Sequence, residues 1–133
     1  MAYVHLVIAL ALLEFFLFGL AVARARARYN VPAPATTGDA AFERYFRVQM
    51  NTLEQLVIFV PSILLFGHYI GASIAAALGL LFVIGRAVYF QGYTRAAEAR
   101  HIGFTLTVVP NIVLLVGGLI GALRAIIVLK GAG

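Results

Sequence analysis

Two short polar segments interrupt a chain that is otherwise strongly apolar, and the first carries three side chains of complementary chemistry. Arg47, Asn51 and Glu54 are spaced i, i+4 and i+7, so in a helix they share one face. A guanidinium binds a carboxylate through two parallel hydrogen bonds, while an amide and a carboxylate can hold a peptide group and an ammonium. This face therefore predicts a binding site for a small anionic, peptide-like molecule.

The second polar segment contains Tyr89 and Tyr93 and is followed by Arg100. If a helix continues past Gly92, these three residues are spaced i, i+4 and i+11 and also share a face. An arginine beside the thiol of a bound molecule favours the thiolate form of that thiol. Lowering the pKa of a free thiol from about 8.5 by two units takes roughly 2.7 kcal/mol, which one partly desolvated cation can supply.

The elements that position these segments are predicted to be membrane helices. The 133 residues are 63% hydrophobic and 11% charged, whereas a soluble domain is usually about 45–50% apolar. A spanning helix needs roughly 20 apolar residues. We therefore predict an all-α membrane protein, a single domain built as a four-transmembrane-helix bundle, with helices at about residues 3–23, 41–70, 73–93 and 102–127.

The basic residues predict the orientation of this bundle. A net charge of +5 would suggest nucleic acid in a soluble protein, but here the positive-inside rule explains it. Residues 24–40 are expected to form a polar loop. The cations gather in the first connection, at the start of the second helix and in the third connection, at Arg24, Arg26, Arg28, Arg44, Arg47, Arg95 and Arg100. These connections should face the cytoplasm and both termini the other side, in a bacterial inner membrane or otherwise the endoplasmic reticulum.

Metal chemistry finds no support in the sequence. The chain has no cysteine, and His5, His68 and His101 are scattered without the spacing of a ligand set. These histidines are better interpreted as interfacial side chains, and no metal cofactor is expected.

Several candidates also have purely structural interpretations. Arg24 and Arg28 can serve as topology signals and anchors for lipid phosphates, and Tyr89 and Tyr93 can be interfacial aromatics. Glu14 lies within the first apolar stretch, where a carboxyl must be paired or protonated. It can be a hydrogen-bonding group of the bundle or part of a transport path.

Both polar segments resemble the signatures of a known family. Residues 42–54, preceded by Thr36-Thr37-Gly38, and residues 86–95, followed by Arg100, are similar to two motifs of the MAPEG family, the membrane-associated proteins in eicosanoid and glutathione metabolism. The resemblance extends to the number of spans and the loop lengths. It implies a homotrimer of four-helix subunits that binds glutathione between neighbouring subunits near the cytoplasmic face.

The resemblance also implies roles for individual residues. Five positions match those that hold glutathione, namely Arg47, Asn51, Glu54, Tyr89 and Tyr93. Gln49 and Arg26 match further glutathione contacts, and Arg100 matches the arginine that stabilises the thiolate. The chain departs from the leukotriene-forming members at Gln55, where they have an aromatic residue, and at Ala27, where they have a second loop arginine.

From these observations we expect a membrane-bound glutathione transferase with glutathione as co-substrate. Its thiolate would attack a hydrophobic electrophile, or the peroxide oxygen of a lipid hydroperoxide. Two alternatives remain open at this point. The first is a non-catalytic lipid-binding scaffold of the same fold, and the second is a small multidrug transporter that exchanges protons at Glu14.

Overall fold

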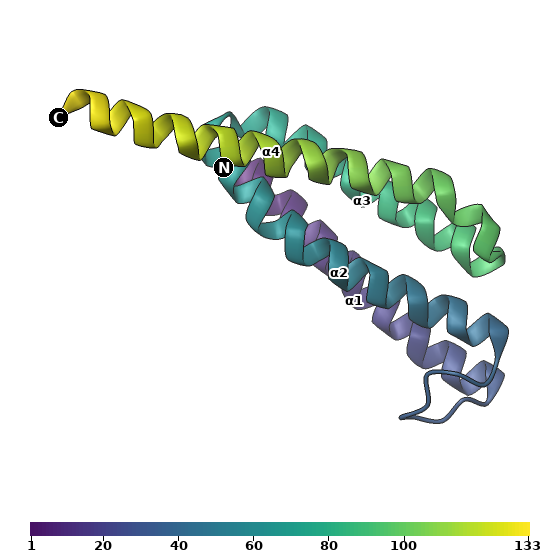
Figure 1. Cartoon of the computed structure of the whole chain (residues 1–133). Helices are drawn as coiled ribbons and strands as arrows, with labels where there is room; N and C mark the ends of the chain where they lie inside the picture. The colour runs from purple at the N-terminus through teal and green to yellow at the C-terminus, as the bar shows by residue number, and fades with distance from the viewer.

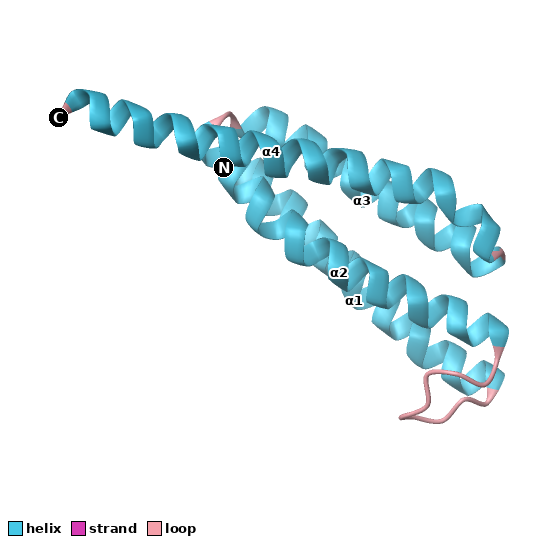
Figure 2. Ribbon diagram, in the orientation of Figure 1, coloured by secondary structure: helices cyan, strands magenta, loops and turns pink.

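The computed structural model describes all residues, 1–133, and contains four long helices and one short one. α1 runs over Ala2–Tyr29, α2 over Ala40–Tyr69 and α3 over Ala72–Arg95. A short 3-10 helix, η1, spans Ala97–Arg100 and leads directly into α4, which spans His101–Ala132. Figure 2 shows helices and no strand, with the longest loop between α1 and α2, so the predicted all-α four-helix architecture is confirmed.

The first helix is longer than the sequence predicted. α1 continues from Arg24 to Tyr29 without a break, so the expectation of a loop starting at Arg24 is wrong. Alanine and arginine, which alternate here, are both strong helix formers, and a helix need not end where its apolar stretch ends. α1 stops at Asn30, whose φ of 56° is left-handed, a common way for asparagine to end a helix.

The start of α2 is fixed by Asp39. Its carboxylate oxygen Oδ1 accepts a hydrogen bond from the backbone N–H of Phe42 at 2.9 Å, as expected for an N-cap residue. Glu43 in the first turn adds a negative charge at the positive end of the helix dipole. The register of the polar face of α2 is therefore set locally, two turns before Arg47.

The helices are arranged as two neighbouring pairs. Figure 1 shows α1 beside α2 and α3 beside α4, with the pairs close together near the N-terminus and spread apart towards the α1–α2 loop. The main core lies where the pairs converge. There the rings of Phe59 and Phe82 stack with centroids 3.9 Å apart, in a buried cluster that also contains Val4 and Leu114. The C-terminal part of α4 extends beyond the other helices (Figure 1).

Most of the apolar surface of this bundle faces outwards. Only 29 of the 133 residues are buried, which leaves rows of leucines such as Leu13, Leu17 and Leu20 about half exposed. All four long helices are long and apolar enough to cross a membrane. Hydrocarbon is the natural surrounding for such a surface, so the chain is an integral membrane protein with several spans.

Candidate functional site

A cavity of about 580 Å³ opens between α2, α3 and the start of α4. Its volume lies within the range of about 300–1,000 Å³ usual for small-molecule sites. It brings together residues of both polar segments, and its lining comprises Arg47, Met50, Asn51, Glu54, Tyr89, Tyr93, Arg100, His101 and Phe104. Six of the eight residues that the sequence singled out as a binding site therefore meet in one place.

The α2 side of the cavity carries one cation, one amide and one anion. Arg47 and Glu54 are exposed, while Asn51 is half-buried. The amide oxygen Oδ1 of Asn51 is shielded from solvent and has no hydrogen-bond partner within the chain. Because a buried acceptor without a donor costs free energy, Asn51 is suited to accept a hydrogen bond from a bound molecule.

The α3 side is formed by two neighbouring tyrosines, whose ring planes are tilted by 35°. The rings of Tyr89 and Tyr93 lie 5.4 Å apart, and the ring of Phe104 on α4 lies 6.4 Å from Tyr89. Gly103 packs directly against the backbone of Tyr89, where a Cβ atom would find no space. This close approach of α4 to α3 holds Tyr89, which is only 4% exposed, at the base of the cavity.

Arg100 reaches the cavity by a different path from the one expected. α3 does continue past Gly92, but it ends at Arg95, and Arg100 lies on η1. Gly92 lets this turn pack closely, because a side chain there would meet the backbone of Ala99. The guanidinium Nη1 of Arg100 donates to the carbonyl of Ala97 at 2.6 Å, and Cζ lies 5.9 Å from the centre of the Tyr93 ring.

Arg86 lies against Tyr89 and is a structural support of this site. From the sequence it was assigned no role of its own. Its side chain is completely buried. Nη2 donates to Oγ1 of Thr52 at 2.9 Å and Nη1 to Oγ1 of Thr107 at 3.3 Å, while Cζ lies 4.2 Å above the ring of Tyr89. One guanidinium thus joins α2, α3 and α4. The signal was available, since an arginine within an apolar span is a functional candidate by default.

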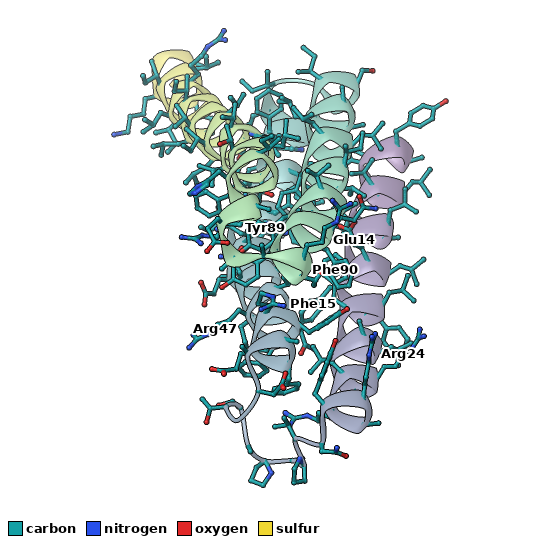
Figure 3. All side chains as sticks on the ribbon, turned by 90° about the vertical axis from the view of Figure 1, so that its right-hand side faces the viewer. Glu14, Phe15, Arg24, Arg47, Tyr89 and Phe90 are labelled. Atoms are coloured by element: carbon teal, nitrogen blue, oxygen red, sulfur yellow. The ribbon has the colours of Figure 1, made fainter.

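Glu14 lies within α1, and its carboxylate oxygen Oε1 is buried without a hydrogen-bond partner. The Nε of Arg86 is likewise buried and unpartnered. Figure 3 shows Glu14 on the α1 side of the bundle, away from Arg47. Glu14 does not line the cavity.

Two predicted contacts, Arg26 and Gln49, lie outside the cavity. The guanidinium Nη1 of Arg26 donates to the carbonyls of Val31 and Ala35 at 3.3 and 2.6 Å. The side chain of Gln49 faces α1, with its amide nitrogen Nε2 beside Gly19. Within this chain, these two side chains therefore do not line the cavity that contains Arg47 and Arg100.

Comparisons with known proteins place this arrangement in a family. The sequence profile of the MAPEG family matches residues 4–120. The chain belongs to the MAPEG family. The resemblance seen in the two polar segments is therefore confirmed over most of the chain.

Three similar proteins illustrate this membership. An uncharacterized protein of Synechocystis sp. is 47% identical over 118 residues, which cover 89% of this chain and 86% of that protein. Human microsomal glutathione S-transferase 2 is 43% identical over 90 residues, 68% of this chain and 61% of the transferase. Leukotriene C4 synthase of Cavia porcellus is 40% identical over 83 residues, 62% of this chain and 55% of the synthase. The match thus spans less than two thirds of either named enzyme.

The cavity also includes residues to which the sequence assigned no role in binding. Met50, His101 and Phe104 line the cavity, although His101 was interpreted from the sequence as an interfacial side chain. Met50 lies within the first polar segment, and His101 follows Arg100 directly in the sequence. These positions could have indicated that both residues lie near the binding site. These side chains add apolar surface and an imidazole beside the charged groups.

Proposed function

We propose that the chain is a membrane-bound glutathione transferase that activates the glutathione thiol as a thiolate. The observation that carries this proposal is the cavity in which Arg47, Asn51 and Glu54 face Tyr93 and Arg100. The printed names of the related transferase and synthase support it. The exposed apolar surface around the cavity fits a second substrate that dissolves in the membrane.

The lining supplies partners for several polar groups of glutathione, which has two carboxylates, an ammonium, two amides and a thiol. The planar guanidinium of Arg47 can bind a carboxylate through two hydrogen bonds. Glu54 can accept from the ammonium, and the free Oδ1 of Asn51 can accept from a peptide N–H. Tyr89 and Tyr93 offer ring faces and hydroxyl groups to the middle of the tripeptide.

Arg100 is the group proposed to stabilise the thiolate. The thiolate sulfur then attacks an electrophilic carbon, a carbon–sulfur bond forms, and the displaced group leaves or is protonated. With a lipid hydroperoxide, sulfur attacks the outer peroxide oxygen, the O–O bond breaks and the alcohol is released. A second glutathione converts the resulting sulfenic acid into the disulfide and water, so the same site supports a peroxidase reaction.

We further propose that the chain acts as a homotrimer, with connections one and three in the cytoplasm. Arg26 and Gln49 lie away from the cavity of their own subunit, so they can contact glutathione only from a neighbouring subunit. Outward-facing leucines leave apolar surface for contacts between subunits in lipid, whereas the glycines of α4 (Gly117, Gly118, Gly121) pack against α2 within the chain.

The test separates this proposal from a non-catalytic lipid-binding scaffold of the same fold. Detergent-purified protein is incubated with glutathione and a small electrophile such as 1-chloro-2,4-dinitrobenzene, or with a lipid hydroperoxide, and the products are quantified. Conjugation above the uncatalysed rate supports a transferase. Saturable glutathione binding without turnover of any electrophile supports the scaffold, and absence of glutathione binding overturns both. The transporter alternative has lost its basis, because the chain belongs to a different family.

A further inference from the structure

A second cavity, of about 320 Å³, lies on another side of the same end of the bundle. It is lined by the last turns of α1 together with Tyr45 of α2 and Phe90 of α3. None of its lining residues belongs to the glutathione site described above. Figure 3 shows Arg24 on α1 and Arg47 on α2 on opposite sides of the view, with Tyr89 and Phe90 between them.

Two arginines of this second cavity have no anionic partner in the chain. Arg24 and Arg28 are spaced i, i+4 on α1 and therefore share a face. Arg26 and Arg44 donate hydrogen bonds to backbone carbonyls, whereas the guanidinium groups of Arg24 and Arg28 form none. The Cζ atom of Arg28 lies 5.3 Å from the centre of the Tyr29 ring.

The cavity floor is aromatic and rigid. Phe90 stacks on Phe18 with the ring centroids 4.7 Å apart, and Tyr45 meets Phe90 edge-on at 5.8 Å. Two guanidinium groups without hydrogen bonds in the chain, in a cavity also lined by Tyr29, Tyr45 and Phe90, make a site for an anionic group attached to an apolar body.

The face of α1 below this cavity is suited to an acyl chain. Leu20 and Leu17 lie four and seven residues before Arg24, and Leu13 lies eleven before it, so all three continue the face that carries the arginine. Each of these leucines is 52% exposed. Because the arginines follow immediately on the apolar part of α1, they lie at the depth of the lipid headgroups.

We propose that this cavity binds the phosphate of an anionic membrane lipid, with Arg24 and Arg28 holding the headgroup and the leucine row of α1 contacting the tail. The continuation of α1 as a helix to Tyr29 is what makes the site, since it places both guanidinium groups on one face and on the side of Phe90. The proposal is independent of catalysis in the neighbouring cavity.

Native mass spectrometry of the full chain in a zwitterionic detergent tests the proposed binding of an anionic lipid. Phosphatidylglycerol and phosphatidylcholine with the same acyl chains are titrated separately, and inorganic phosphate in a third series. We expect phosphatidylglycerol to bind at least tenfold more tightly than phosphatidylcholine. The double variant Arg24→Gln/Arg28→Gln should lose that preference, whereas Arg24→Lys/Arg28→Lys, which keeps both charges, should retain most of it.

The matched control is Arg124→Gln/Lys130→Gln, which removes the same charge from the other end of the bundle and should bind as the wild type does. Equal binding of both lipids overturns the proposal, as does an unchanged preference in Arg24→Gln/Arg28→Gln. Inorganic phosphate that competes as strongly as the lipid would show an anion site but overturn the assignment to a membrane lipid. Since glutamine is nearly as good a helix former as arginine, the double variant is expected to fold.

Discussion

Replacing Arg100 by alanine tests the proposed chemistry most directly. Arg100 lines the cavity and is exposed on one side, while its hydrogen bond to the Ala97 carbonyl holds the guanidinium in place. If this cation stabilises the thiolate, the variant should still bind glutathione but should leave its thiol protonated at neutral pH.

The magnitude follows from the position of Arg100. A thiolate about 4 Å from the guanidinium gains about 4 kcal/mol at an effective dielectric constant of 20 and about 1 kcal/mol in water. Because Arg100 is exposed, an intermediate value of about 2 kcal/mol applies, which lowers the thiol pKa by about 1.5. At pH 7 the thiolate fraction is then about 50%, compared with about 3% for a free thiol of pKa 8.5.

The rate changes less than the thiolate fraction. A thiolate of lower pKa is a weaker nucleophile, with a Brønsted coefficient of about 0.4–0.5, so a 15-fold loss of thiolate becomes roughly a threefold loss of rate from this term alone. A larger loss would indicate that Arg100 also orients the sulfur. The dependence on pH has a clear sign, because the rate deficit of the variant grows below pH 7. Well above pH 8.5 both enzymes hold thiolate, so the difference in thiolate fraction vanishes and the more basic thiolate of the variant should react somewhat faster than that of the wild type.

The assay is ultraviolet difference absorbance near 240 nm, where thiolates absorb, during titration with glutathione at several pH values. The wild type should give a saturable signal at neutral pH, and Arg100→Ala should give it only about 1.5 pH units higher. Arg95→Ala is the control, because Arg95, the last residue of α3, is also an exposed arginine but does not line the cavity. An Arg100→Ala signal with the wild-type midpoint would refute the proposed role.

Three further substitutions test other parts of the structure. Arg47→Ala should weaken glutathione binding about tenfold in calorimetry through loss of a charge-assisted hydrogen bond, and unchanged affinity would remove Arg47 from the site. Gly103→Ala should destabilise the fold by about 1–3 kcal/mol in thermal unfolding, because the new Cβ atom would meet the backbone of Tyr89. Gly131→Ala is the control, since a Cβ atom there meets no other atom. Equal melting temperatures for the two variants would contradict the close packing at Gly103. Arg86→Met should lower the melting temperature and the affinity for glutathione, since it removes the guanidinium that joins three helices under Tyr89. A variant with wild-type stability and affinity would show that Arg86 has no supporting role.

The sequence predicted those features that depend on local spacing. The face shared by Arg47, Asn51 and Glu54 follows from helical periodicity alone, and the four spans follow from apolar length. The end of α1 was placed too early because the charge of Arg24 was taken as the end of the helix, whereas Asn30 ends it.

Features that depend on contacts between distant residues were not predicted. Nothing in the spacing shows that Arg86 reaches Thr52 and Thr107, which lie 34 and 21 residues away. Arg100 was assigned to the α3 face by continuing a helix that ends before it. It reaches the cavity because Gly92 lets η1 fold back, and a close approach of this kind is set by tertiary packing.

The length of α4 has a consequence for the membrane in which the chain resides. Its 32 residues measure about 48 Å at 1.5 Å per residue, against a hydrocarbon core of about 30 Å. The overhanging end is still apolar, with Ile127, Val128 and Leu129 more than two-thirds exposed. Such hydrophobic mismatch is relieved by tilting the helix, by burying the overhang against protein, or by stretching the adjacent lipids. The thickness of the bilayer should therefore affect this protein, and it should do so at the end of the bundle opposite the cavity that contains Arg100.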